Sequence, residues 1–190
     1  MTKDQTGRVI GAAFGLVFIQ ANAVALPTAV AAPLRLLSLA AFLWVAVLGR
    51  RGGQAGQASP AAPGGSGTRF GRRYWYVVAV EVAGLAAGLF VIARVLHAPE
   101  ATVGWIAFVV GVHFFGLAVA WRRPALHVLG ASIAACGAAG LVLAAFDAPV
   151  VAIRTVAGVL PGVLLLASVL RPGRTTPAAA TSEVRSGTPA

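Results

Sequence analysis

Charged residues are scarce in this chain of 190 residues, at 11 % of the total, whereas soluble domains contain roughly a quarter. Acidic residues are the scarcest, with five Asp and Glu against 15 Lys and Arg. A soluble protein with so little charge could not cover its surface with polar groups. Hydrophobic residues make up 58 % of the chain. This composition predicts a protein that is solvated by lipid.

Cysteine occurs only once, at Cys136, which excludes an intramolecular disulfide and a metal site built from several thiolates. The three histidines lie in different segments and lack the H-E-x-x-H spacing of a zinc site. His113 lies in the middle of its segment, while His97 and His127 lie near opposite ends, which argues against a bis-histidine haem site. We therefore expect no metal and no cofactor.

Signatures of catalysis and of nucleic-acid binding are missing as well. The sequence contains no nucleophile elbow and no phosphate-binding loop. A formal net charge of +10 would by itself suggest nucleic acid. However, the basic residues lie between apolar blocks and do not interleave with aromatic residues. We expect neither an enzyme nor a nucleic-acid partner.

Long apolar runs are what the chain has in abundance. A helix that spans a ~30 Å hydrocarbon core needs about 20 mostly apolar residues. Six segments qualify: Val9–Leu26, Leu34–Gly49, Tyr74–Leu96, Ala101–Trp121, Ala125–Phe146 and Pro149–Leu170. The sequence predicts an all-α, polytopic membrane bundle of about six transmembrane helices, with the lipid bilayer as its main partner.

Two segments, residues 50–73 and 171–190, are rich in Gly, Pro, Ser and Ala. They cannot bury enough apolar surface to order themselves, so they are predicted to be a disordered linker and a disordered tail. The alternative is a docking role toward a partner or anionic lipid. The linker separates helices one and two (9–49) from the other four (74–170), and residues 1–8 precede the first helix.

The basic residues predict the orientation, because Lys and Arg concentrate in cytoplasmic loops. With the N-terminus inside, twelve of them are cytoplasmic: Lys3, Arg8, Arg50, Arg51, Arg69, Arg72, Arg73, Arg122, Arg123, Arg171, Arg174 and Arg185. Only three lie at the opposite ends: Arg35, Arg94 and Arg154. Both termini are therefore predicted to be cytoplasmic in a plasma (inner) membrane.

The first segment has a second interpretation. Lys3 and Arg8 before the apolar run 9–19, followed by Ala21-Asn22-Ala23, also resemble a signal peptide with an A-x-A cleavage site. Cleavage would leave five spans with the remaining orientation unchanged. A glycine motif within the segment favours a retained helix.

Small residues recur at helical spacing and allow two helix backbones to approach each other. The G-x-x-x-G pattern occurs at Gly11–Gly15, Gly84–Gly88 and Gly158–Gly162, and Ser132, Cys136 and Gly140 form a similar stripe. This pattern predicts packing within one bundle, or contact with a second copy or another membrane protein. It suits three tandem helical hairpins, and equally any membrane protein rich in Ala, Gly and Leu.

Two polar residues, Glu81 and His113, lie well inside predicted spans, where an unpaired charge costs several kcal/mol. Folding their hairpin about residues 98 and 99 places His113 about one turn from the residue opposite Glu81. We predict that the two side chains face the bundle interior and contact each other. They form either a structural pair or a site for a proton or a substrate.

A second set of polar residues lies toward the opposite, outer end of the spans. The candidate outer cluster consists of Gln20, Asn22, Arg35, Arg94, Asp147 and Arg154. Anchoring at the membrane interface explains most of them. The alternative is a convergent polar pocket for an anion, in which Arg154 is the residue of most interest.

The segment Val110–Arg123 (VGVHFFGLAVAWRR) contains a G-x-H-F-F-x-L-A core. This core resembles a segment of a family of small, uncharacterised bacterial membrane proteins with about six helices, which often carry proline where this chain has Gly116. The resemblance implies the same fold and makes His113 the family's marked residue. It implies no substrate.

These observations lead to two functional hypotheses. The first is a small transport-related or membrane-accessory protein of the bacterial plasma membrane that uses Glu81 and His113. The alternative is a structural or interaction protein without a solute pathway, which packs or oligomerises through glycine-rich helix faces.

Overall fold

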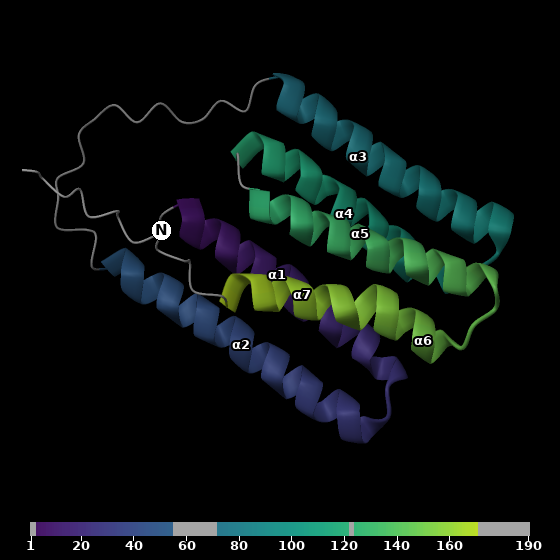
Figure 1. Cartoon of the computed structure of the whole chain (residues 1–190), viewed down its shortest axis with the longest axis horizontal. Coiled ribbons are helices and arrows are strands. Elements are labelled where there is room, and N and C mark those ends of the chain that lie inside the picture. The colour runs from purple at the N-terminus through teal and green to yellow at the C-terminus, as the bar shows by residue number, and fades with distance from the viewer. Residues whose placement is uncertain (1–2, 55–71, 122–123, 171–190) are drawn as a thin grey trace, which may run out of the picture.

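The computed structural model describes residues 3–54, 72–121 and 124–170, and nearly all of these are helical (Figure 1). The long helices are α1 (Lys3–Asn22), α2 (Thr28–Gln54), α3 (Arg72–Val91), α4 (Ala101–Trp121), α5 (Pro124–Ala145) and α7 (Leu160–Leu170). The short elements are the 3₁₀ turn η1 (Ala23–Ala25), the helix α6 (Val150–Arg154) and two π-helical segments, η2 (Ile92–Leu96) and η3 (Thr155–Val159).

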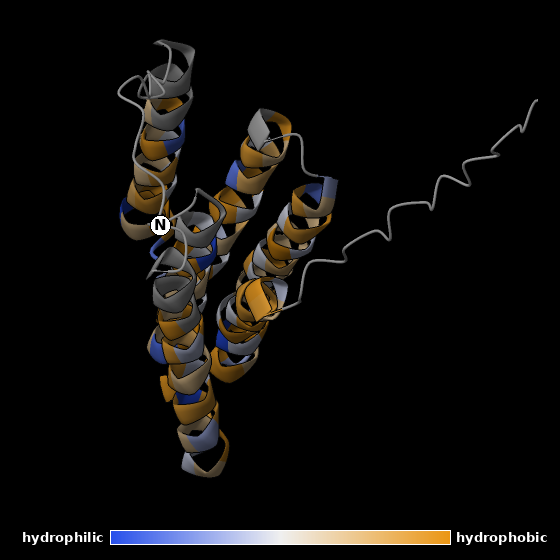
Figure 2. Cartoon of the chain, turned by 90° about the vertical axis from the view of Figure 1, so that its left-hand side faces the viewer, coloured by the Kyte–Doolittle hydropathy of each residue, from blue (hydrophilic) through white to orange (hydrophobic). Residues whose placement is uncertain are grey.

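Within the described residues, six helical segments are long and apolar enough to cross a membrane, from Gly7–Ala25 to Val150–Leu170. The last span is built from α6, η3 and α7 in sequence. Hydrophobic residues cover most of the helix surfaces (Figure 2). The prediction of an all-α membrane bundle is confirmed, and the protein is a multi-pass membrane protein.

The second helix differs from its predicted bounds, because it begins at Thr28 and contains Pro33 in its interior. The predicted segment began at Leu34, directly after Pro33, and proline inside a helix removes one helical hydrogen bond. Proline is tolerated inside transmembrane helices where other groups satisfy the freed carbonyl. Arg35 consequently lies two turns inside the helix and not at its start. The helix also continues to Gln54, while residues 55–71 and 171–190 of the predicted linker and tail lie outside the described residues.

The first and last spans pack together through the glycines predicted for helix packing. A Cβ atom placed on Gly15 would lie 2.9 Å from the carbonyl oxygen of Gly162, and one on Gly162 would lie 2.8 Å from that of Gly15. Gly11 packs on Val169 one turn away. Ile19 and Leu166 are buried beside this contact. The first and third G-x-x-x-G motifs are therefore two sides of one interface.

The second close interface joins α4 and α5. Gly104 on α4 lies against the backbone at Gly137 and Leu141, and Gly137 lies against the backbone of Phe108. The buried stripe of α5 consists of Gly130, Ile133, Gly137, Gly140 and Ala144. Of the predicted stripe, Gly140 belongs to this face, while Ser132 and Cys136 are half-buried and lie about 100° around the helix from Ile133 and Gly137.

The three predicted hairpins correspond to α1 with α2, α3 with α4, and α5 with the last span. The most extensive packing, between α4 and α5 and between α1 and α7, joins helices of different hairpins. Helix α3 lies at one edge of the bundle and packs mainly on α4 (Figure 1). Its two glycines differ, because Gly88 is covered by the Trp105 ring and Gly84 has no neighbour within 4 Å of an added Cβ atom. Within the described residues, only one of the two glycines of the second G-x-x-x-G motif packs against another helix.

The bundle has two different ends (Figure 1). The three short turns, residues 23–27, 97–100 and 146–149, lie at the end that we call the turn end. The start of α1, the end of α2 and the start of α3 lie at the other end, which we call the terminal end. Arg35 lies in the first third of α2, Arg94 in η2 and Arg154 at the end of α6, and each of these segments adjoins one of the three short turns.

Candidate intramembrane polar site

Glu81 on α3 and His113 on α4 contact each other directly. The distance from Glu81 Oε2 to His113 Nδ1 is 2.6 Å, which is short for a hydrogen bond and typical of one with a charged partner. Glu81 belongs to the candidate membrane span Ala79–Leu96 and His113 to Ala101–Val119, so both residues lie in segments apolar enough to cross a membrane. The structure therefore brings together the two residues that the hairpin register predicted to lie near each other.

The register of this hairpin depends on features that the sequence analysis did not identify. The indole Nε1 of Trp105 donates a hydrogen bond to the carbonyl oxygen of Leu85, at 3.2 Å, and the ring packs on Gly88. The π-helical segment η2 contains more residues per turn than an α-helix, so α3 needs more residues than α4 to reach the same depth. These features bring His113 within reach of Glu81, although the predicted register placed it about one turn away.

The site lies at the edge of the bundle. The side chain of Glu81 is 23 % exposed and that of His113 is 38 % exposed. The two side chains are half-buried at the α3–α4 contact and do not lie in the centre of the bundle as predicted, because α3 packs mainly on α4 among the described elements. Phe114 packs edge-on against the imidazole ring, with the ring centroids 6.5 Å apart.

The contact leaves the second ring nitrogen of His113 available. Nδ1 is used by Glu81, and within the described residues Nε2 has no hydrogen-bond partner. A carboxylate on one imidazole nitrogen fixes the ring orientation and holds the proton there when the ring is neutral. Nε2 then carries a lone pair. The arrangement can accept and release a proton at Nε2 while Glu81 holds the ring in place.

The predicted outer cluster separates into three parts. In the first part, the Gln20 amide donates hydrogen bonds to the carbonyl oxygen of Arg35, at 3.1 Å, and to Ser38 Oγ, at 3.3 Å. Arg35 Nη2 returns a bond of 3.3 Å to the carbonyl oxygen of Gln20. Ser38, only 3 % exposed, was missed because a serine in an apolar run gives no signal of its own. These bonds join α1 to α2 at membrane depth.

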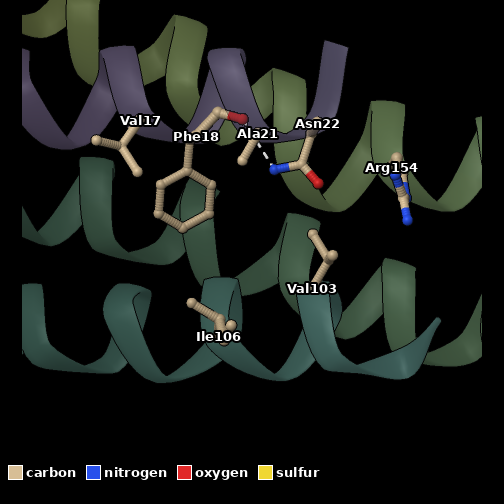
Figure 3. Close-up of a pocket in the computed structure, with 7 residues that line it drawn as sticks. All are labelled: Val17, Phe18, Ala21, Asn22, Val103, Ile106 and Arg154. Atoms are coloured by element: carbon tan, nitrogen blue, oxygen red, sulfur yellow. Dashed lines mark hydrogen bonds between the residues drawn. The ribbon is translucent and has the colours of Figure 1, made fainter. Parts of the chain in front are cut away.

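The second part is formed by Asn22 and Arg154, which line a pocket between α1, α4 and α6 (Figure 3). The Asn22 side chain is buried against Gly158 of the π-helical segment η3, and its amide donates to the carbonyl oxygen of Phe18 at 2.8 Å. Arg154 lies at the other side of the pocket. Of the six residues of the predicted outer cluster, Asn22 and Arg154 are the two that line this pocket.

The third part consists of Arg94 and Asp147, which lie apart from both sites. Each is exposed, in η2 and in the turn before α6 respectively. Asp147 has a positive φ of 52°, as has His97 with 53° in the preceding turn. Neither Arg94 nor Asp147 forms an ion pair with another residue of the described ranges. They are turn residues and not members of a common pocket.

Within the described ranges, no three His, Cys, Asp or Glu residues are close enough to hold a metal ion. The comparisons with known proteins add no assignment: no family model, no curated protein and no solved structure matches the chain. The resemblance of the segment around His113 to small bacterial membrane proteins therefore stays a prediction. The functional proposal rests on the geometry of the Glu81–His113 contact.

Proposed function

We propose that this chain is a small transport-related or membrane-accessory protein whose Glu81–His113 pair exchanges protons within the membrane. The observation that carries the proposal is the 2.6 Å contact between Glu81 Oε2 and His113 Nδ1, which joins two candidate membrane spans. Ionisable residues at this depth are costly, and where they are found they mark proton relays and ion or substrate pathways. Histidine is also the side chain that ordinarily changes charge near neutral pH.

The mechanism follows from the weak attachment of α3. Protonation of Nε2 gives a cationic ring beside an anionic carboxylate, which strengthens the attraction between α3 and α4. Loss of that proton leaves a neutral ring and a weaker hydrogen bond. Since α3 packs mainly on α4, this change acts on the helix with the fewest other contacts. Proton exchange at His113 would therefore alter the separation of α3 from the bundle and open or close a path beside it.

The test is solute movement in reconstituted vesicles. The protein is placed in liposomes with an imposed pH gradient and a mixture of polar metabolites, and the vesicle contents are identified by mass spectrometry. We expect accumulation of at least one solute to depend on the gradient and to fall at least tenfold in Glu81→Gln and His113→Gln. Glu100→Gln, which removes a carboxylate in the turn before α4, is the matched control and should transport normally. Vesicle contents indistinguishable from those of empty liposomes would argue against transport.

The alternative is an interaction protein that uses its glycine-rich faces, and one observation favours it. On α3, Gly84 is open and Val80 and Val82 beside it are 70 % and 60 % exposed. The test is disulfide cross-linking of Gly84→Cys in membranes, in a Cys136→Ala background. Exposed Val142 on α5, changed to cysteine, is the control. Dimers specific to position 84, without solute movement, would favour this alternative.

We further propose that both termini are cytoplasmic in the plasma membrane of a bacterium. The support is the sequence pattern, in which twelve basic residues fall in the segments predicted to be cytoplasmic and three at the opposite ends of the predicted spans. The number of spans is consistent with this proposal, because a chain that crosses the membrane six times returns to the side on which it began.

A further inference from the structure

The pocket beside Asn22 is independent of the Glu81–His113 site. It has a volume of about 270 Å³ and lies between three elements (Figure 3). Val17, Phe18, Ala21 and Asn22 come from α1, Val103 and Ile106 from α4, and Arg154 from α6. Five of these seven residues are apolar, so the walls suit a hydrocarbon group.

The polar residues of the pocket lie at one end of it. Asn22 is the last residue of α1, at the turn end, while Val17 is five residues deeper, or ~7 Å. Arg154 lies four residues into the last span, or ~6 Å from its start. This is the depth at which lipid headgroups meet acyl chains, and a long arginine side chain reaches toward that boundary. The pocket is therefore polar toward the headgroups and apolar toward the bilayer centre.

The charge of the pocket is positive. Arg154 is half-buried and forms no ion pair with any carboxylate of the described ranges. Asn22 uses its amide hydrogens on the Phe18 carbonyl oxygen, which leaves Oδ1 as an acceptor (Figure 3). A guanidinium without a carboxylate partner is complementary to a phosphate group. The neighbouring acceptor is complementary to a hydroxyl group.

The pocket is open to the membrane. Val17 is 62 % exposed, and Ala21, one turn along the same face of α1, is exposed as well. At this depth the exposed surface of the bundle contacts acyl chains and not water. A free inorganic anion would satisfy Arg154 but would leave the apolar walls without a partner. A ligand with both an anionic group and a hydrocarbon chain satisfies the two requirements together.

We propose that this pocket binds one anionic phospholipid of the leaflet at the turn end. The phosphate group lies on Arg154, a headgroup hydroxyl donates to Asn22 Oδ1, and the start of one acyl chain lies along Val17, Phe18 and Ile106. Phosphatidylglycerol has this chemistry, because it combines a phosphodiester with headgroup hydroxyls. The lipid would connect α1, α4 and α6, whose contacts with one another are otherwise few at this end.

The experiment measures lipid binding by native mass spectrometry of the full chain after removal of bound lipid. The protein is titrated with phosphatidylglycerol and with phosphatidylcholine of the same acyl chains. We expect phosphatidylglycerol to bind about tenfold more tightly than phosphatidylcholine, because a tenfold difference in affinity corresponds to about one hydrogen bond to a charged group. Arg154→Gln should remove this preference. Arg94→Gln removes an exposed arginine at the same end and should bind as the wild-type protein does.

Two further measurements test whether the ligand needs both the apolar walls and the anionic group. Ala21→Phe fills the apolar part of the pocket from an exposed position, and should weaken binding of both lipids while Arg154 is intact. Excess inorganic phosphate should not displace the phospholipid. Equal binding of the two lipids, unchanged binding by Arg154→Gln, or complete displacement by inorganic phosphate would each overturn the proposal. Glu81→Gln should leave lipid binding unchanged, which separates this proposal from the proton site.

Discussion

At the scale of single residues, the membrane makes polar side chains expensive, and this protein satisfies them locally. Glu81 is paired with His113, and Gln20 bonds to the Arg35 carbonyl oxygen and to Ser38. Hydroxyl groups bond within their own helices, as Thr155 does to the carbonyl oxygen of Val151 at 2.6 Å. Arg35 Nε is an exception, because it is buried without a partner in the described part of the chain. Among the described residues, the Glu81–His113 pair alone combines a contact between two titratable groups with an available ring nitrogen.

The strength of this pair is testable by a double-mutant cycle. Glu81→Gln and His113→Gln should each lower the free energy of unfolding, and the coupling between them should be about 1 kcal/mol, as is typical of side-chain hydrogen bonds between membrane helices. The measurement is reversible unfolding in mixed detergent micelles. Glu100→Gln combined with His113→Gln is the control and should show no coupling. A coupling indistinguishable from this control would mean that the contact contributes nothing to stability.

At the scale of helices, two kinds of interface hold the bundle together. The α1–α7 and α4–α5 interfaces bring glycine backbones into contact, so their close packing relies on missing side chains. The α3–α4 interface relies instead on the Trp105 ring, its hydrogen bond to the Leu85 carbonyl oxygen and the Glu81–His113 pair. Helix α3 is therefore the element most easily displaced.

Trp105→Phe tests whether α3 is held less firmly than the helices of the glycine interfaces. The substitution removes the hydrogen bond to Leu85 and part of the contact with Gly88, and should cost about 1 kcal/mol. Hydrogen exchange measured by mass spectrometry should become faster in α3 and stay unchanged in α1 and α7. Trp44→Phe is the matched control, because Trp44 is 62 % exposed on α2. Uniform acceleration throughout the chain would show that α3 is not a separate unit.

Substitution by alanine should have opposite effects on stability at a packed glycine and at an open one. Gly137→Ala adds a Cβ atom that meets the Phe108 backbone, and should destabilise the protein by about 1–3 kcal/mol through overpacking. Gly84→Ala adds the same atom in open space and should be neutral, or stabilising by up to about 1 kcal/mol through helix propensity. Thermal unfolding in detergent compares the two variants. Equal effects at the two positions would contradict the packing described for α4 and α5.

At the scale of the whole molecule, the start of α1, the end of α2 and the start of α3 lie at the terminal end of the bundle. The three short turns at the opposite end contain no Lys or Arg. The two candidate sites also differ in depth. The proton site lies between α3 and α4, and the lipid pocket lies near the turn end between α1, α4 and α6.

The orientation is testable by cysteine labelling in intact cells, in a Cys136→Ala background. Cysteine at Ser66 or Ser186 should resist a membrane-impermeant thiol reagent, because basic segments stay on the cytoplasmic side. Cysteine at exposed Pro99, in the turn before α4, should react and is the positive control. Labelling at position 66 with protection at position 99 would reverse the proposed orientation.

Most of the fold was predictable from the sequence, and much of the candidate site was as well. The six spans follow from apolar run length. Counting residues from the turn places Glu81 and His113 within about one turn of each other, while their exact register depends on the Trp105 contact and on η2. The start of α2 was mispredicted, since the effect of Pro33 depends on partners that lie elsewhere in the fold. Ser132 and Cys136 each lie one residue from a buried position of α5, because a helix with apolar residues on every face gives no periodicity by which to choose one face.

Composition and run length thus determined by themselves that this protein crosses the membrane several times as a helical bundle, because lipid admits only long apolar segments with satisfied backbones. Tertiary structure decided which faces meet. It paired Gly15 with Gly162, placed Glu81 and His113 at the bundle edge, and separated Arg154 from Arg94. The reason is physical: in lipid, helices select their partners by close packing, and close packing depends on the shapes of both surfaces at once.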